Sequence, residues 1–200
     1  MRIISGKHRG LKLCEFEGED IRPTSDRVKE SLYAILGPVQ DCVVLDLFCG
    51  SGNLGLEAVS RGARKVVFND SSKDSLALLK KNIARFKEPI PAEVRNLDFM
   101  ECLAQRTRYD VIFLDPPYRT DMGLKALQII GKRGLLNRDG VAVYERNCPF
   151  EGDIRGLAKI DERKYGKTYI TFFKRTEDVE EQAPEEAAPA DEGTGQQRLL

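Results

Sequence analysis

The sequence predicts an α/β protein built on a largely parallel sheet, and two observations lead to this class. From about residue 42 onward, short apolar runs alternate with longer amphipathic stretches, which is the pattern of strands joined by helices. The run at 43–47 is almost continuously apolar and is followed by glycines, as expected of a parallel strand buried on both faces. The 200 residues, 41% of them hydrophobic, suffice for one domain with an appendage.

Each apolar run and each amphipathic stretch defines one expected element. The predicted strands lie at 43–47, 66–69, 92–96, 111–114, 141–144, 157–160 and 169–173. A helix is predicted over 54–61, because apolar residues recur there at helical spacing and Gly62 follows as a stop signal. A second helix is predicted over 75–86, where apolar residues three or four apart form a stripe.

The two ends of the chain depart from this pattern. Apolar residues on either side of a glycine-containing turn predict a small N-terminal hairpin, followed by a helix at 25–36. We therefore expect an extension over 1–40 packed onto a domain over 41–175. Residues 176–200 carry eight acidic residues and one arginine, a net charge of −7 against +7 for the rest of the chain. This tail is predicted to be disordered, since it cannot bury enough apolar surface to order itself.

Cysteine, histidine and hydropathy usage exclude several classes of site. Five cysteines without a C-x-x-C pair argue against a disulfide framework and a zinc site, and His8 is the sole histidine. We expect the cysteines to be small buried apolar residues and the chain to hold no metal. No apolar run approaches the ~20 residues of a membrane span. No apolar segment follows the basic start, so a cytoplasmic protein is predicted.

A glycine-rich loop between the first strand and its helix is the first motif with chemical content. Gly50, Gly52 and Gly55 satisfy G-x-G-x-x-G, and Asp70 at the end of the next strand stands where a ribose-binding acid belongs. This motif alone fits a nicotinamide dinucleotide site, an S-adenosylmethionine site or a tight turn without ligand. Asp46 favours the second, because an acid beside the loop repels a pyrophosphate but attracts an ammonium and a sulfonium group.

The stronger motif is Asp115-Pro116-Pro117-Tyr118, directly after the predicted strand at 111–114. Consecutive prolines fix two φ angles and remove two N–H donors, so the segment presents acceptors and no donors. Such a cluster suits an exocyclic amino group, whose hydrogens the Asp115 carboxylate and the Pro116 carbonyl would accept. Tyr118 would stack on the base. No cysteine nucleophile lies nearby in sequence, which disfavours covalent methylation of cytosine carbon.

Two further groups of residues fit either a binding role or a purely structural one. Asp98 would accept from the adenine amino group of the cofactor, with Phe99 against the ring, or would be an exposed loop acid. The basic residues Arg22, Arg27 and Lys29 would hold phosphates, or would pair with the nearby acids of the N-terminal helix.

The combination resembles the bacterial 16S ribosomal RNA guanine-N2 methyltransferases of the RsmD type over residues 1–175. The strings that carry the resemblance are Arg2 to Gly10, Arg22-Pro23-Thr24, Asp26 to Glu30, Asp46 to Ala63 and Asp115 to Tyr118. It implies a Rossmann-like class I methyltransferase fold with seven strands, mostly parallel, the last antiparallel. It also implies S-adenosylmethionine as methyl donor and N2 of one guanine as acceptor. The RNA partner would be 16S rRNA or an assembling small subunit, and we expect a monomer.

The predicted site therefore has three parts. The catalytic residues are Asp115, Pro116, Pro117 and Tyr118. The cofactor-binding residues are Asp46, Phe48, Gly50, Ser51, Gly52, Asp70, Asp98 and Phe99. The RNA-facing residues are Arg9, Arg22, Thr24, Arg27 and Lys29. The chain departs from many relatives at Asn69-Asp70, where they have a glutamate one position earlier, and we predict Asp70 as the ribose contact.

Three other functions stay open. A DNA adenine-N6 methyltransferase would use the same tetrapeptide, but such enzymes usually carry a separate recognition domain, for which 1–175 leave no room. A nicotinamide-dependent oxidoreductase explains the glycines but leaves residues 115–118 without a purpose. A non-catalytic RNA-binding or assembly module would keep the basic surface and would survive the loss of Asp115.

Overall fold

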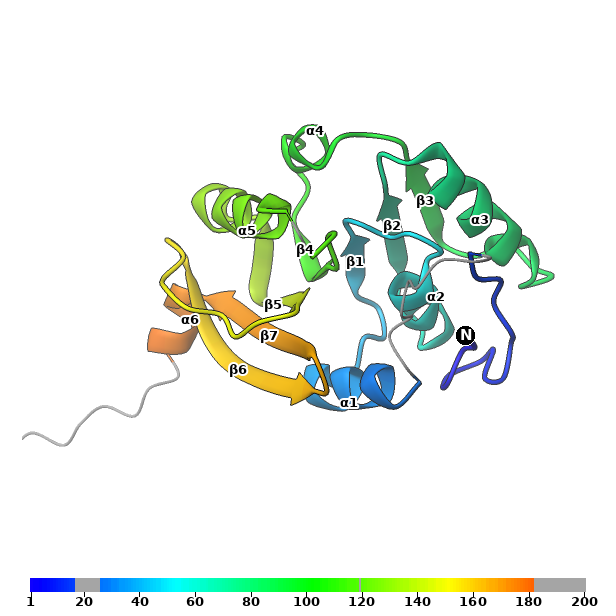
Figure 1. The fold of residues 1–200 in the computed structure, drawn as a ribbon, viewed down its shortest axis with the longest axis horizontal. Helices are drawn as coiled ribbons and strands as arrows, with labels where there is room; N and C mark the ends of the chain where they lie inside the picture. Colours follow the sequence, from blue (N-terminus) through cyan, green and yellow to red (C-terminus); the bar gives the residue numbers. More distant parts are fainter. Residues whose placement is uncertain (17–25, 119, 182–200) are drawn as a thin grey trace, which may run out of the picture.

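The candidate site is carried by one seven-stranded sheet, seen in a computed structural model that describes residues 1–16, 26–118 and 120–181 (Figure 1). The strands are β1 (Val43–Asp46), β2 (Lys65–Asn69), β3 (Ala92–Arg95), β4 (Tyr109–Leu114), β5 (Leu136–Arg146), β6 (Leu157–Tyr165) and β7 (Thr168–Arg175). Their order is β3-β2-β1-β4-β5-β7-β6. All pairs are parallel except those of β7, which is antiparallel to β5 and β6. The predicted mostly parallel sheet with an antiparallel last strand is therefore confirmed.

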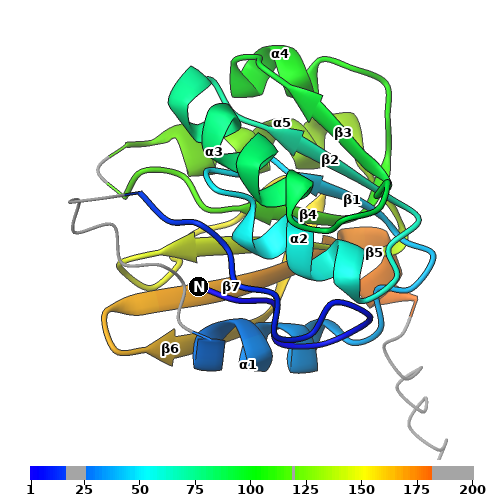
Figure 2. The same ribbon diagram turned by 90° about the vertical axis from the view of Figure 1, so that its right-hand side faces the viewer.

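Helices cover both faces of the sheet. They are α1 (Asp26–Leu36), α2 (Asn53–Ser60), α3 (Lys73–Ala84), α4 (Phe99–Leu103), α5 (Met122–Arg133) and α6 (Thr176–Glu180). α1, α2 and α3 lie on one face, and α4 and α5 on the other (Figures 1 and 2). Each face of the sheet has its own hydrophobic core. Phe113 of β4 packs in the core under α1, α2 and α3, and its neighbour Ile112 packs in the core under α4 and α5, because successive strand side chains point to opposite faces. This explains why the strands are apolar without alternation.

The N-terminal hairpin is held on α2 and α1 by a buried charged cluster. Its strands meet in an antiparallel bridge between Arg2 and Lys12, which confirms the predicted hairpin. Glu57 of α2, fully buried, accepts hydrogen bonds from the backbone N–H groups of Ile4 (2.8 Å) and Ser5 (3.0 Å). The Lys29 Nζ of α1 lies 3.2 Å from a Glu57 carboxylate oxygen and donates to the Arg2 carbonyl at 2.7 Å.

Lys29 corrects one prediction. We expected it to face RNA phosphates, but its side chain has no exposed surface, because the hairpin and α2 close over it. A signal for this was present in the sequence. Lys29 lies three and four residues before Leu32 and Tyr33, the buried residues of the same helix face. Burial lowers the pKa of Lys29, and the Glu57 carboxylate opposes that shift.

The strands β5 and β6 are longer than predicted, because both include polar residues. β5 begins at Leu136 rather than 141, since the polar stretch between lies at a register irregularity against β4. β6 extends to Tyr165 rather than 160, because it is the edge strand and one of its sides is exposed. The short helix α4 and the helix α5 had not been located from the sequence.

The tail prediction is wrong for its first residues. The segment at 176–181 is ordered, with helix α6 on β7, and Asp178 is buried there. The Asp178 carboxylate accepts from the Asp139 backbone N–H at 2.9 Å and lies 3.1 Å from the Arg175 guanidinium. These two contacts tie the segment to β5 and to the end of β7, which composition alone does not reveal. Residues 182–200 lie outside the described residues.

All five cysteines are free thiols, but they are not uniformly buried. Cys49 and Cys102 are buried as expected, whereas Cys148 is exposed, which the prediction had wrong. Among the described residues, no group of histidine, cysteine and acidic side chains is arranged to hold a metal ion. Within the same ranges, no helix combines the length and apolarity needed to span a membrane.

Candidate active site

The glycine loop connects β1 to α2 at the carboxyl edge of the sheet. Gly52 caps α2 with φ 86°, a left-handed conformation that favours glycine. Gly55 allows a close approach, since a Cβ there would meet Phe68 Cε1 at 2.3 Å. The same lack of a side chain brings the Gly55 N–H to an oxygen of Asp46, to which it donates at 2.9 Å. The loop is thus shaped by backbone contacts and by one acid.

Asp46 is a buried carboxyl, 2% exposed, at the end of β1. Burial raises the pKa of Asp46 to about 7; the Gly55 N–H opposes this and the charge of Asp70 adds to it. The side chain holds the loop in place rather than lying at the surface. Asp46 is therefore close to its titration point at neutral pH in the free protein.

This raised pKa makes the stability of the free protein pH-dependent. In the unfolded chain Asp46 loses its proton near pH 4, whereas in the folded chain it keeps it until about pH 7. The folded state thus binds more protons between these values, so its stability decreases as pH rises through that window. Asp46→Asn keeps an acceptor for Gly55 and should remove this part of the slope. Urea unfolding at pH 5 and pH 8 measures the change in the free energy of unfolding with pH. An equal change in the native protein and in Asp46→Asn would refute the assignment of this pH dependence to Asp46.

Asp70 follows β2 and contacts the glycine loop. One carboxylate oxygen accepts from the Gly50 backbone N–H at 2.9 Å, and the other from the Ser72 N–H at 2.8 Å. Its neighbour Asn69 is 1% exposed, and its amide donates to the carbonyls of Leu47 and Leu97 at 3.1 and 3.2 Å. Asp70 is partly exposed to solvent, whereas the buried Asn69 amide links the segments that follow β1 and β3. A ligand could therefore reach Asp70 but not Asn69, which favours Asp70 as the ribose candidate.

The third acid of this edge follows β3. Asp98 caps α4 by accepting from the Met100 backbone N–H at 2.8 Å. Phe99 is buried, and its ring lies 5.7 Å from that of the half-buried Phe48, tilted by 43°. The structure therefore places the half-buried Phe48 ring, backed by Phe99, near Asp98. The cap is a structural role of Asp98 that is compatible with the predicted one.

Asp115 to Tyr118 leave β4 at the same edge, beside the end of β1. Burial, then the charges of Glu145 and Asp46, raise the pKa of the Asp115 carboxyl well above its usual range. Tyr118 is 45% exposed, and its hydroxyl donates to a Glu145 oxygen at 2.8 Å. Burial, then the charges of Glu145 and Asp115, raise the pKa of Tyr118, so the phenol stays protonated.

Sequence reasoning missed Glu145. It lies near the end of β5 and is 5% exposed. The signal that identified the other acids applies here as well, since Glu145 directly follows the predicted strand at 141–144, and parallel strands end at one edge. Neither the glycine loop nor the segment at 115–118 includes this residue.

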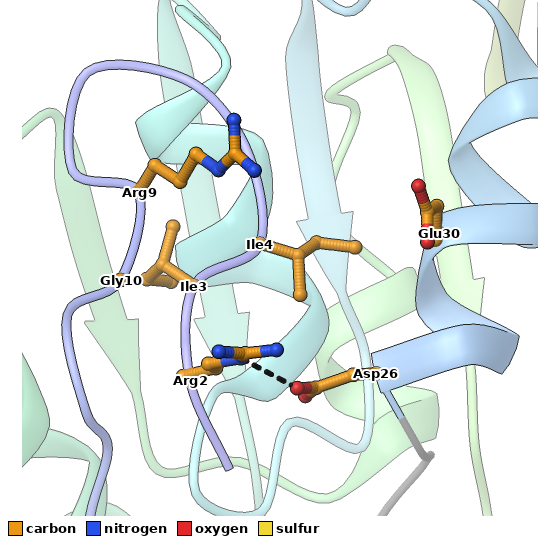
Figure 3. Close-up of a pocket in the computed structure, with 7 residues that line it drawn as sticks. All are labelled: Arg2, Ile3, Ile4, Arg9, Gly10, Asp26 and Glu30. Atoms are coloured by element: carbon orange, nitrogen blue, oxygen red, sulfur yellow. Dashed lines mark hydrogen bonds and ion pairs between the residues drawn. The ribbon is translucent and has the colours of Figure 1, made fainter.

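The predicted RNA-facing residues do not form one group. Arg9 and Arg27 are exposed on the hairpin and on α1, Lys29 is buried, and Arg22 and Thr24 lie outside the described residues. A pocket opens between hairpin and helix (Figure 3). Its lining consists of Arg2, Ile3, Ile4, Arg9, Gly10, Asp26 and Glu30. Within it Arg2 is paired with Asp26 at 2.7 Å, and Arg9 and Glu30 stand on opposite sides.

Comparisons with known proteins cover nearly all of the described chain. Residues 1–174 match the family described as conserved hypothetical protein 95. The ribosomal RNA small subunit methyltransferase D of Haemophilus influenzae is 39% identical over 150 residues, 72% of this chain and 78% of that one. A Bacillus subtilis protein, provisionally named an rRNA methyltransferase, is 34% identical over 88% of this chain and 99% of its own length.

A solved structure supports the same grouping. An Escherichia coli chain that carries the provisional name of methyltransferase superposes with a TM-score of 0.78 at 32% identity. The superposition covers 88% of this chain and 97% of that chain. The shared fold thus extends over both the N-terminal extension and the sheet.

Proposed function

The chain belongs to the conserved hypothetical protein 95 family of RsmD-type ribosomal RNA methyltransferases, and from this we propose that it methylates N2 of a guanine in 16S rRNA. The methyl donor is S-adenosylmethionine. The observation that carries the proposal is the position of Asp115, a half-buried carboxyl in a donor-free segment beside the glycine loop. A substrate that offers hydrogen-bond donors, as an exocyclic amine does, fits this segment.

The residues along the strand edge fit the methyl donor. Asp70 and Asp98 place two carboxylates at the ends of β2 and β3, and the buried Asp46 at the end of β1 adds negative charge when ionised, which suits a cationic group and opposes a pyrophosphate. The half-buried Phe48 offers a ring face for adenine, and the buried Phe99 ring packs against Phe48 from the core. When bound, S-adenosylmethionine supplies an electrophilic methyl group on a sulfonium. This distribution of acids disfavours the nicotinamide-dependent alternative.

Asp115 and Pro116 then determine the orientation of the guanine amino group in the site. Their carboxylate and carbonyl oxygens accept the two amine hydrogens, which turns the nitrogen lone pair out of conjugation with the ring and toward the methyl group. Once the nitrogen gains a methyl group it carries a surplus proton, which the Asp115 carboxylate would accept. Tyr118 stacks on the base and limits its position. Asp115 must be ionised for this role.

RNA binding is assigned to the hairpin and α1. Arg9 and Arg27 are exposed there and carry the positive charge that phosphates require. A domain of this size is expected to recognise a preformed RNA shape, supplied by an assembling small subunit in the cytoplasm. The pocket beside Arg9 is part of this proposed surface (Figure 3).

Transfer of labelled methyl from S-adenosylmethionine to rRNA and to small-subunit particles from a strain lacking the enzyme tests this function. Nucleoside mass spectrometry should find N2-methylguanosine. Label in N6-methyladenosine would instead support the adenine-N6 alternative. Cofactor binding without transfer to any RNA or DNA would favour a non-catalytic module.

Asp70→Ala should weaken binding of S-adenosylmethionine by about 1–3 kcal/mol, the cost of leaving polar groups unpaired. The variant removes the acceptor for Gly50 as well as the ribose contact. Titration calorimetry with the cofactor measures the change. Asp74→Ala, which removes an exposed acid of the first turn of α3, is the matched control. An unchanged dissociation constant for Asp70→Ala would place the ribose contact elsewhere.

A further inference from the structure

Glu145 is a buried acid for which the proposed methyl transfer has no use. Its side chain is 5% exposed, and removing a carboxylate from water is costly unless it gains partners. The Tyr118 hydroxyl donates to its Oε1 at 2.8 Å. This contact joins β5 to the segment after β4, across 27 residues of sequence.

The sheet register puts Glu145 next to the proposed catalytic acid. Leu114 of β4 is paired with Tyr144 of β5 in parallel register, so the residues that follow, Asp115 and Glu145, stand side by side at the carboxyl edge. On its other side Glu145 is paired with Ile170 of β7. The start of β7 brings Thr168 close enough for its side chain to hydrogen-bond Tyr118 as well.

We propose that Glu145 is a positioning residue, whose carboxylate anchors the Tyr118 hydroxyl and so holds the tyrosine ring beside Asp115, where the target base stacks. The inference rests on the proposed function for the role of the ring, but the anchoring itself does not.

The physical reason is the exposure of Tyr118. Tyr118 is 45% exposed, so packing alone restricts its χ1 and χ2 less than it would those of a buried tyrosine. A hydrogen bond from the phenol to a charged acceptor stabilises one orientation more strongly than a neutral bond does. The ring is then already in place when a base arrives, which reduces the entropy that binding must overcome.

The anchoring is tested without any methyl transfer. Fluorotyrosine is incorporated into the full chain, and the fluorine resonance of Tyr118 is identified by its loss in Tyr118→Phe. Glu145→Leu should move this resonance and lower the pH at which it titrates, since a nearby negative charge is removed. Glu151→Leu, at an exposed acid, should change neither. An unmoved Tyr118 resonance in Glu145→Leu would overturn the inference, whether or not the protein is a methyltransferase.

The positioning role is tested by a double-mutant cycle on methyl transfer, at a pH where Asp115 is fully ionised. Glu145→Leu and Tyr118→Phe should each lower kcat/KM for RNA about ten- to hundredfold, the worth of a hydrogen bond to a charged group. The kcat/KM of the double variant should be no lower than that of the less active single variant. Glu145→Gln, which keeps an acceptor, should restore part of the activity, and KM for S-adenosylmethionine should stay unchanged. Losses that multiply in the double variant would show that Glu145 does not act through Tyr118.

Discussion

Asp115→Ala should reduce methyl transfer by about 10²–10⁴-fold, the usual contribution of a positioned acid or base. The variant lacks both the acceptor for the amine hydrogen and the group that takes the surplus proton. The fold should be retained, because the substitution removes a carboxyl that burial and the charge of Glu145 already penalise. Calorimetry with S-adenosylmethionine and thermal unfolding should give values close to those of the native chain. Turnover near the native rate would refute the mechanism.

Asp115→Asn separates the two roles of this residue. An amide still accepts a hydrogen bond but carries no charge and takes no proton, so we expect a loss smaller than that of alanine. The native protein should become more active as pH rises through the raised pKa of Asp115, since only the ionised form accepts both hydrogen bond and proton. The asparagine variant should lack this rising limb. A limb that persists in it would mean that another group titrates.

Glu57→Leu should lower the free energy of unfolding by about 3–5 kcal/mol, the usual cost of breaking a buried ion pair. Lys29 and Glu57 both have no exposed surface, and the hairpin backbone at Ile4 and Ser5 donates to the same carboxylate. When the Glu57 carboxylate is removed, the Lys29 ammonium group and the N–H groups of Ile4 and Ser5 remain buried and lose this acceptor. Urea unfolding of the full chain measures the loss.

Two further variants show whether burial is the cause. Glu181→Leu breaks the ion pair between Glu181 and Arg138, two side chains that are 59% and 74% exposed. It should lower the free energy of unfolding by less than about 1 kcal/mol. Lys29→Met combined with Glu57→Leu replaces both charges by apolar groups and should recover part of the stability. A similar small loss for Glu57→Leu and Glu181→Leu would contradict the buried cluster.

Some features of this protein depend on neighbouring residues and others on contacts between distant parts of the chain. The existence and order of the strands, the glycine loop and the segment at Asp115 were predicted, because apolar periodicity, glycine stops and proline pairs are properties of neighbouring residues. Parallel strands end at one edge of a sheet, so the sequence placed Asp46, Asp70 and Asp115 at that edge, and the pairing of β1 with β2 and β4 brings them together.

Burial and pairing were decided only by the tertiary structure. Lys29 and Arg27 are both basic residues of α1, yet Lys29 lies inside because residues 27 positions upstream and 28 downstream close over it. Glu145 meets Tyr118 through the register of β4 and β5, and Asp178 orders the start of the tail through a contact with Asp139. The sequence by itself determined the order of the elements and where the acids of the edge stand. Which charged side chains are removed from water depends on the packing of distant elements, and that only the fold determines.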